Sequence, residues 1–186
     1  MVRLRSAWSG TTARGLRVAA FVCAALAVSV GVAANGEDFQ AGTDVNGIAS
    51  LAFAVERLVE RSKPAEWALR RSCLYYAFAG QHLLARQGIS ASLWVGAVVY
   101  DPGTAASHQI WPHAWLETAT HFIDFSALPR WGTVKVIPRH LVARGPWEVR
   151  PGTTRVLALP RVEDLQVVAY LAFHRQRFDR RVKGEN

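Results

Sequence analysis

The sequence predicts an α+β domain, with helices first along the chain and a small antiparallel sheet after them. Apolar residues recur at helical spacing in two stretches before residue 87. After residue 88 the chain changes to short β-rich runs separated by turn residues. The cysteine of the chain body, Cys73, falls where the second helical pattern begins. We therefore expect N-terminal helices that place Cys73 at a helix start, packed on the sheet.

The first helical pattern runs from Ile48 to Arg61, and Lys63-Pro64 ends it because proline breaks a helix interior. The second runs from about Cys73 to Arg86. Ser72 is expected to cap this helix through its hydroxyl. Gly88 is expected to end it in the left-handed conformation that glycine adopts easily.

The β-rich part opens with residues 89–100, an unbroken run typical of a central strand. Asp101-Pro102-Gly103 predicts a turn, and a polar loop up to Trp111 would border a cleft. Two shorter strands, His113–Glu117 and His121–Phe125, should form a hairpin.

Beyond the hairpin, the pattern predicts loops at Pro129–Gly132 and Ile137–Arg139 and another strand at Arg155–Leu159. A last helix is expected over about Val162 to Val182, opening with Glu163 and Asp164 beside its positive end. Its apolar face would carry Leu165, Val168, Leu171 and Phe178.

The N-terminal region differs from the rest in composition. Residues 18–34 hold no charge and follow an arginine-bearing lead, which is typical of a secretory signal peptide or a membrane anchor over residues 1–34. Residues 35–46 are interpreted as a linker, 47–160 as the folded domain and 161–186 as a basic C-terminal helix. The expected location is exported, periplasmic or membrane-anchored. A start codon annotated too far upstream would instead make the protein cytoplasmic.

The net charge of +8 does not indicate a nucleic-acid partner. Four of the 22 Lys and Arg residues lie in residues 1–34, so 18 remain against 14 acidic residues. No known nucleic-acid-binding pattern accompanies the basic run from His174 to Lys183, which is interpreted as a solvated helix face. A hydrophobic content of 51% over 186 residues is enough for one domain with a real core.

Three residues suggest thiol chemistry. His113 follows Cys73 by 40 residues, and Asp124 follows His113 by 11. A thiol needs a nearby base to become a nucleophile, and that base needs a third group to orient it. Aligned residues on neighbouring strands have Cβ atoms about 5 Å apart, so Asp124 can orient His113. Free N–H groups at the helix start, with Arg70 and Arg71 nearby, would favour a thiolate and could stabilise an oxyanion.

Other interpretations of these residues stay open. Cys73 could be an inert buried thiol, and Glu117 is a second carboxylate on the face of His113. With Cys23 inside the apolar N-terminal run, a structural disulfide is not expected. The thiol and the scattered histidines lack metal-ligand spacing, so we expect no metal and no cofactor. The histidines that compete for the base role are His82, His108, His121 and His140.

Several motifs, over about residues 65–130, resemble the transglutaminase-like superfamily. The chain is most similar there to the branch that contains the lasso-peptide maturation proteases, the B2-type proteins. The motifs are Ser72-Cys73-Leu74, a helix ending in Leu83-Leu84-Ala85-Arg86-Gln87-Gly88-Ile89, the strand core Trp94-Val95-Gly96-Ala97-Val98, Pro112-His113-Ala114-Trp115-Leu116-Glu117 and Phe122-Ile123-Asp124.

The resemblance implies a papain-like α+β fold with Cys73 as nucleophile, His113 as general base and Asp124 as its orienting partner. It implies a peptidase, amidase or acyltransferase that acts on an amide of a peptide or protein through a thioester. Two features depart from the family pattern. Residues 125–129 replace the Pro-Thr that follows the aspartate in many relatives. The lasso leader peptidases act in the cytosol, whereas this chain begins like an exported protein.

Two other classes of function remain as alternatives. The fold could serve as a catalytically silent binding or scaffold module, at a membrane face for example. The chain could also be a membrane-associated structural protein that matches the family motifs by chance.

Overall fold

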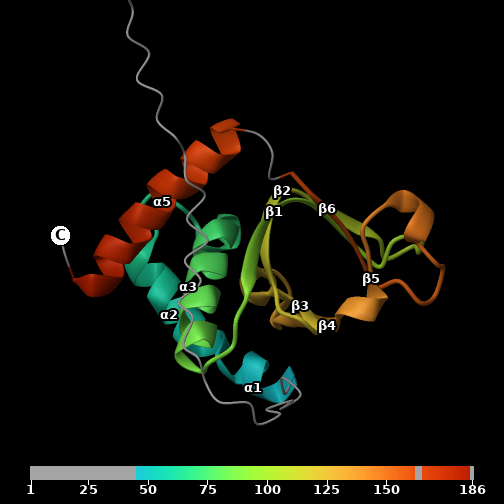
Figure 1. The fold of residues 1–186 in the computed structure, drawn as a ribbon, viewed down its shortest axis with the longest axis horizontal. Coiled ribbons are helices and arrows are strands. Elements are labelled where there is room, and N and C mark those ends of the chain that lie inside the picture. The colour runs from blue at the N-terminus through green and yellow to red at the C-terminus, as the bar shows by residue number, and fades with distance from the viewer. Residues whose placement is uncertain (1–44, 162–164, 185–186) are drawn as a thin grey trace, which may run out of the picture. The chain divides into compact units, whose positions relative to one another are not determined.

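The computed structural model describes residues 45–161 and 165–184, which lie in one compact unit spanning residues 40–186 (Figure 1). The expected signal or anchor segment, the linker up to residue 44, and Glu163 and Asp164 fall outside the described residues. Among the residues described, no helix has the length and apolar character needed to cross a membrane.

The N-terminal part is helical, as expected, but it is divided differently. The single helix predicted from Ile48 to Arg61 is two helices, α1 (Val45–Ser50) and α2 (Ala52–Ser62). Both helices bury apolar residues in one core, so the apolar period continues across the break and could not reveal it.

Helix α3 (Cys73–Arg86) begins and ends where the sequence predicted, and Gly88 follows it at a φ of 76°. The predicted cap is wrong. Ser72 has φ −100° and ψ 32°, outside the extended conformation that a capping residue adopts, and its hydroxyl donates to the Ala68 carbonyl oxygen at 3.0 Å. A short 3₁₀ turn, η1 (Leu69–Arg71), leads into the helix.

The sheet has six strands in the order β4-β3-β2-β1-β6-β5, with the long strand β1 inside it. Every neighbouring pair is antiparallel except β5 and β6, which are parallel. The strand bounds are β1 Ser92–Tyr100, β2 His108–Glu117, β3 His121–Asp124, β4 Lys135–Pro138, β5 Val142–Ala143 and β6 Val156–Pro160.

Three predicted loops contain regular structure. The last four residues of the loop expected up to Trp111 belong to β2, which begins at His108. Residues 128–131 form a helical turn, α4 (Leu128–Trp131). Residues 137 and 138 end β4, an edge strand, where proline is tolerated because no inner ladder bond is lost. Strands of four and two residues are too short for alternation to reveal them.

The two edges of the sheet approach each other. Only the 3₁₀ turn η3 (Arg139–Leu141) separates β4 from β5, although these strands occupy opposite edges. Pro138 and Val142 are four Cα–Cα steps apart, which span about 14 Å at most. Five strand spacings of about 4.8 Å would separate the edges of a flat sheet by more than that, so the sheet must curl. Ile137 of β4 and Val142 of β5 accordingly pack against one cluster on the inner face, built around Trp115 and Phe122.

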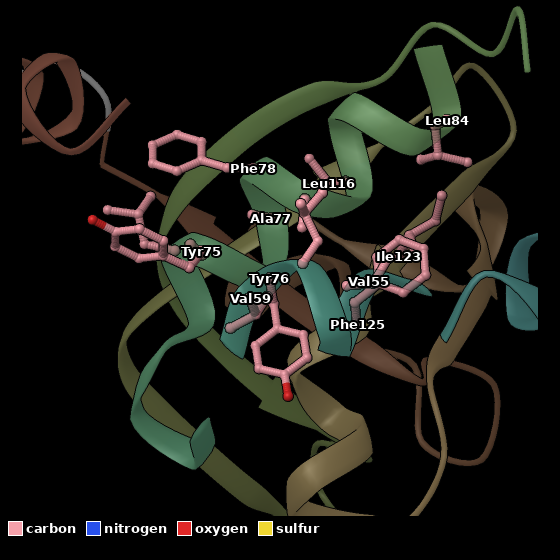
Figure 2. Packing of buried hydrophobic residues seen from close by; sticks show 14 of the residues in the cluster. Val55, Val59, Tyr75, Tyr76, Ala77, Phe78, Leu84, Leu116, Ile123 and Phe125 are labelled. Atoms are coloured by element: carbon pink, nitrogen blue, oxygen red, sulfur yellow. The ribbon is translucent and has the colours of Figure 1, made fainter. Parts of the chain in front are cut away.

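The opposite face of the sheet carries the larger core. Residues of α2 and α3 pack there against Leu116, Ile123 and Phe125 (Figure 2). Helix α5 (Leu165–Lys183) joins this core through Phe178, which is fully buried. The prediction that Val168 lies on the packed apolar face is wrong, because this residue is 48% exposed. The C-terminal helix is thus basic on its outer side but packed against α2 and α3.

Substitution of Gly96 should destabilise the fold more than substitution of Gly80. A Cβ at Gly96 would lie 2.1 Å from the backbone oxygen of Leu159, which cannot move without breaking the β1–β6 ladder. A Cβ at Gly80 would lie 2.4 Å from the Phe125 ring, which can rotate. In urea unfolding we expect Gly96→Ala to cost about 3 kcal/mol or more and Gly80→Ala about 1–2 kcal/mol. A cost for Gly96→Ala no larger than that for Gly80→Ala would contradict this account of the close β1–β6 approach.

Candidate active site

Cys73 is the first residue of α3 and lies in a cleft of about 530 Å³. It is partly exposed, so it is not fully buried as the inert-thiol alternative assumed. His113 from β2 lines the same cleft. The described part of the cleft therefore contains a thiol at a helix start and an imidazole from the sheet.

His113 and Asp124 form a buried ion pair. Nε2 of His113 lies 2.9 Å from Oδ2 of Asp124, and both side chains are about 1% exposed or less. Leu116 pairs with Ile123 across the hairpin, and this register continued places Asp124 opposite Trp115. His113 thus meets Asp124 as the diagonal neighbour on the same face, a register that the sequence did not reveal.

Two further residues hold the Asp124 carboxylate. The Tyr100 hydroxyl donates to Oδ2 at 2.5 Å, while the backbone N–H and hydroxyl of Ser126 donate to Oδ1 at 2.9 and 2.7 Å. Burial would raise the pKa of Asp124, but His113 and these donors outweigh it and lower that pKa. Sequence reasoning missed both residues. The Asp-x-Ser spacing was a usable local signal for Ser126, whereas nothing in the sequence pointed to Tyr100.

The electrostatics of His113 favour the charged imidazolium. Burial lowers its pKa, but Asp124 and then Cys73 act in the opposite direction and raise it to about 10. Because Nε2 is held by Asp124, Nδ1 is the nitrogen available to the thiol. Within the described residues, Nδ1 has no partner that meets hydrogen-bond geometry. The Trp115 ring lies parallel to the imidazole, at 18° and 6.5 Å between centroids, and restricts its orientation.

The competing side chains are engaged elsewhere. Glu117 accepts from Trp115 Nε1 at 2.8 Å and pairs with Arg144, so it does not reach His113. In the described part of the chain, no group of three or more His, Cys, Asp and Glu residues is placed to hold a metal ion. The four histidines proposed as competitors lie outside the residues that line the cleft: His82, His108, His121 and His140.

The fold and this site define a class: a domain of mixed helices and a six-stranded sheet, consistent with the papain-like α+β fold. A family model described as the transglutaminase-like superfamily matches residues 15–138, two thirds of the chain. The chain belongs to that superfamily, which is often cysteine-dependent and includes cysteine peptidases and acyltransferases.

The other comparisons add little. No curated protein matches the chain. One solved crystal structure, titled only as a genomics target, is 15% identical and covers 70% of this chain and 77% of its own, with a TM-score of 0.48.

Removing the charge of Asp124 should change the titration of His113. In Asp124→Asn, burial still lowers the pKa of His113, but the carboxylate that raised it is gone. The pKa of His113 should therefore fall from about 10 to 6.5 or below. Ring-nitrogen chemical shifts in NMR titrations measure this directly. The exposed Glu60→Gln variant removes one carboxylate elsewhere and should leave the titration unchanged. A His113 titration that is the same in Asp124→Asn and wild type would contradict the electrostatic coupling.

The same pair sets a pH window for stability. The folded pKa of His113 is raised, so its contribution is complete below 6.5 and is lost as pH rises through about 10. The pKa of Asp124 is lowered, so its contribution is present above 3.8 and is lost as pH falls below that value. In urea unfolding at a series of pH values, Asp124→Asn should therefore show a weaker dependence on pH than wild type.

Proposed function

We propose that this protein is a cysteine-dependent enzyme that performs acyl chemistry on a peptide amide, as a peptidase, amidase or acyltransferase. Cys73 is the nucleophile, His113 the proton-transfer group and Asp124 the residue that orients it. One observation carries the proposal. The buried His113–Asp124 pair leaves a single imidazole nitrogen unsatisfied, on the cleft that contains Cys73.

The reaction follows from these positions. The Cys73 sulfur attacks the carbonyl carbon of the amide, and a tetrahedral oxyanion forms. As it collapses, the C–N bond breaks and the His113 imidazolium gives its proton to the leaving amine, leaving a thioester on Cys73. Water or a second amine then attacks the thioester with His113 as base, and the C–S bond breaks to return the thiolate. The acceptor decides between hydrolysis and transfer.

The start of α3 offers donors for the oxyanion. The first N–H groups of a helix have no partner inside that helix, and those of Cys73 and Leu74 lie at this position. Both residues line the cleft. One well-placed donor of this kind typically lowers the barrier by about 3 kcal/mol. These two backbone groups are our candidates for that role.

A narrower form of the proposal is maturation of a peptide, as in the lasso-peptide branch. The Cys73-Leu74 motif, the helix end at residues 83–89 and the segment 112–117 support it. Its test is cleavage of a lasso precursor between leader and core, with an unrelated peptide of equal length as control. Equal cleavage of both peptides would contradict the maturation role and would still agree with the general amide chemistry.

Replacement of the nucleophile should abolish turnover without unfolding the protein. Cys73→Ala removes the sulfur but fits a small side chain at a helix start, so the circular dichroism spectrum should be unchanged. Mass spectrometry of a casein-derived peptide pool should show product formation by wild type and at least about 10³-fold less by the variant. Cys23→Ala is the matched control and should retain activity. Wild-type turnover by Cys73→Ala would favour a silent binding module instead.

Alkylation gives a second test of Cys73 as the nucleophile. If Cys73 has this role, iodoacetamide should label it at about pH 5.5 at least about 10-fold faster than it labels glutathione. Asp124→Asn should remove most of that advantage, because its imidazole loses the charge. Labelling that follows the profile of an ordinary thiol in wild type would count against the proposed nucleophile.

A further inference from the structure

Arg130, on α4, has one guanidinium nitrogen, Nε, without a partner among the described residues. It lines the cleft together with Cys73 and His113. Its Nε atom is buried and has no hydrogen-bond partner among the described residues, and none of the ion pairs found there includes it. Burial raises the pKa of Tyr100 well above its usual value and Arg130 opposes that shift, which places the guanidinium near the Tyr100–Asp124 end of the site.

Asp124 does not serve as the missing partner. Its Oδ2 accepts from Tyr100 and lies against His113, and its Oδ1 accepts twice from Ser126. The carboxylate is therefore satisfied without Arg130. A buried, unsatisfied donor on a charged group is costly, and an arginine retained in that state at a cleft wall suits an external acceptor.

Two arginines give the cleft wall a positive charge. Arg71 and Arg130 line the cleft, while the charge of His113 is balanced by its buried partner Asp124. None of the described lining residues is aspartate or glutamate. A low-dielectric cleft with charges of one sign concentrates ligands of the opposite sign. The electrostatics select an anionic ligand.

The remaining walls are apolar. Trp67 precedes η1, Trp111 lies on β2 and Tyr170 lies on α5, so three separate segments contribute aromatic rings to the cleft. A ligand that fits must therefore combine apolar surface with a negative group. Peptides that carry a carboxylate meet both conditions.

We propose that Arg130 is a substrate-binding residue that pairs with a carboxylate of the peptide, either its C-terminal carboxylate or an acidic side chain. The planar guanidinium can donate two parallel hydrogen bonds to a carboxylate, and Nε is one of the two atoms that do so. The inference rests on the proposed function for its substrate class. Binding itself requires no turnover, so it is tested separately.

The test is calorimetric binding to the full chain in a Cys73→Ala background, where no peptide is consumed. The probes are four N-acetylated peptides with a shared phenylalanine–alanine core. One pair ends in a free carboxylate or in a carboxamide. The other pair ends in a carboxamide and carries glutamate or glutamine inside. We expect one carboxylate peptide to bind about 10- to 100-fold more tightly than its neutral twin, and the pair that shows the preference identifies the source of the carboxylate.

Three additional substitutions make the result specific. Arg130→Gln should reduce the preference to less than about 2-fold, and Arg130→Lys should keep part of it because the charge remains but the two-pronged geometry is lost. Arg150→Gln removes one positive charge from an exposed site outside the cleft and should keep the whole preference. Circular dichroism checks that each variant is folded.

Two outcomes would overturn the proposal: neutral and charged twins that bind equally in the Arg130-containing protein, or a preference that persists in Arg130→Gln. Failure of the proposed chemistry looks different. A wild-type protein without amide turnover that still binds the charged twin through Arg130 would contradict the enzyme proposal and leave carboxylate recognition in place.

Discussion

The buried pair between His113 and Asp124 is the constraint on which the rest of the site depends. Two charges removed from water cost several kcal/mol each unless geometry and further hydrogen bonds compensate them. Here the compensation comes from Tyr100 and Ser126, which occupy the other acceptor sites of the carboxylate. Strands β1, β2 and β3 must therefore keep their register, because a slip of one residue would move a partner to the other face.

Two separate cores bring the halves of the site together. The inner face of the curled sheet packs around Trp115 and Phe122 and holds the His113 side of the cleft. The opposite face packs against α2, α3 and α5 (Figure 1, Figure 2) and fixes α3. Cys73 is the first residue of that helix. The cleft lies where these two parts meet. Its shape depends on the sheet and the helices together.

Helix α5 links the C-terminal segment to the site. Phe178 is buried in the core, and Nδ1 of His174 lies 3.1 Å from the hydroxyl oxygen of Tyr75. Nearer its start, Tyr170 and Leu171 reach the cleft wall. The family match ends at residue 138, before this helix begins. Tyr170 and Leu171 thus add to the cleft wall from outside the matched region.

The sequence alone determined the elements that local periodicity and turn residues encode. The bounds of α3, the left-handed Gly88, the central strand and the hairpin could all be read from it. So could the residue types that suggested thiol chemistry, because Cys73 begins α3, His113 lies in β2 and Asp124 ends β3. Tertiary structure decided the rest. Register and packing between segments far apart in the chain decided several features. These are the break at Leu51, the edge strands β4 and β5, the diagonal contact of His113 with Asp124, the donor Tyr100, and Arg130 with its unpartnered Nε. Those are long-range contacts, and no local pattern records them.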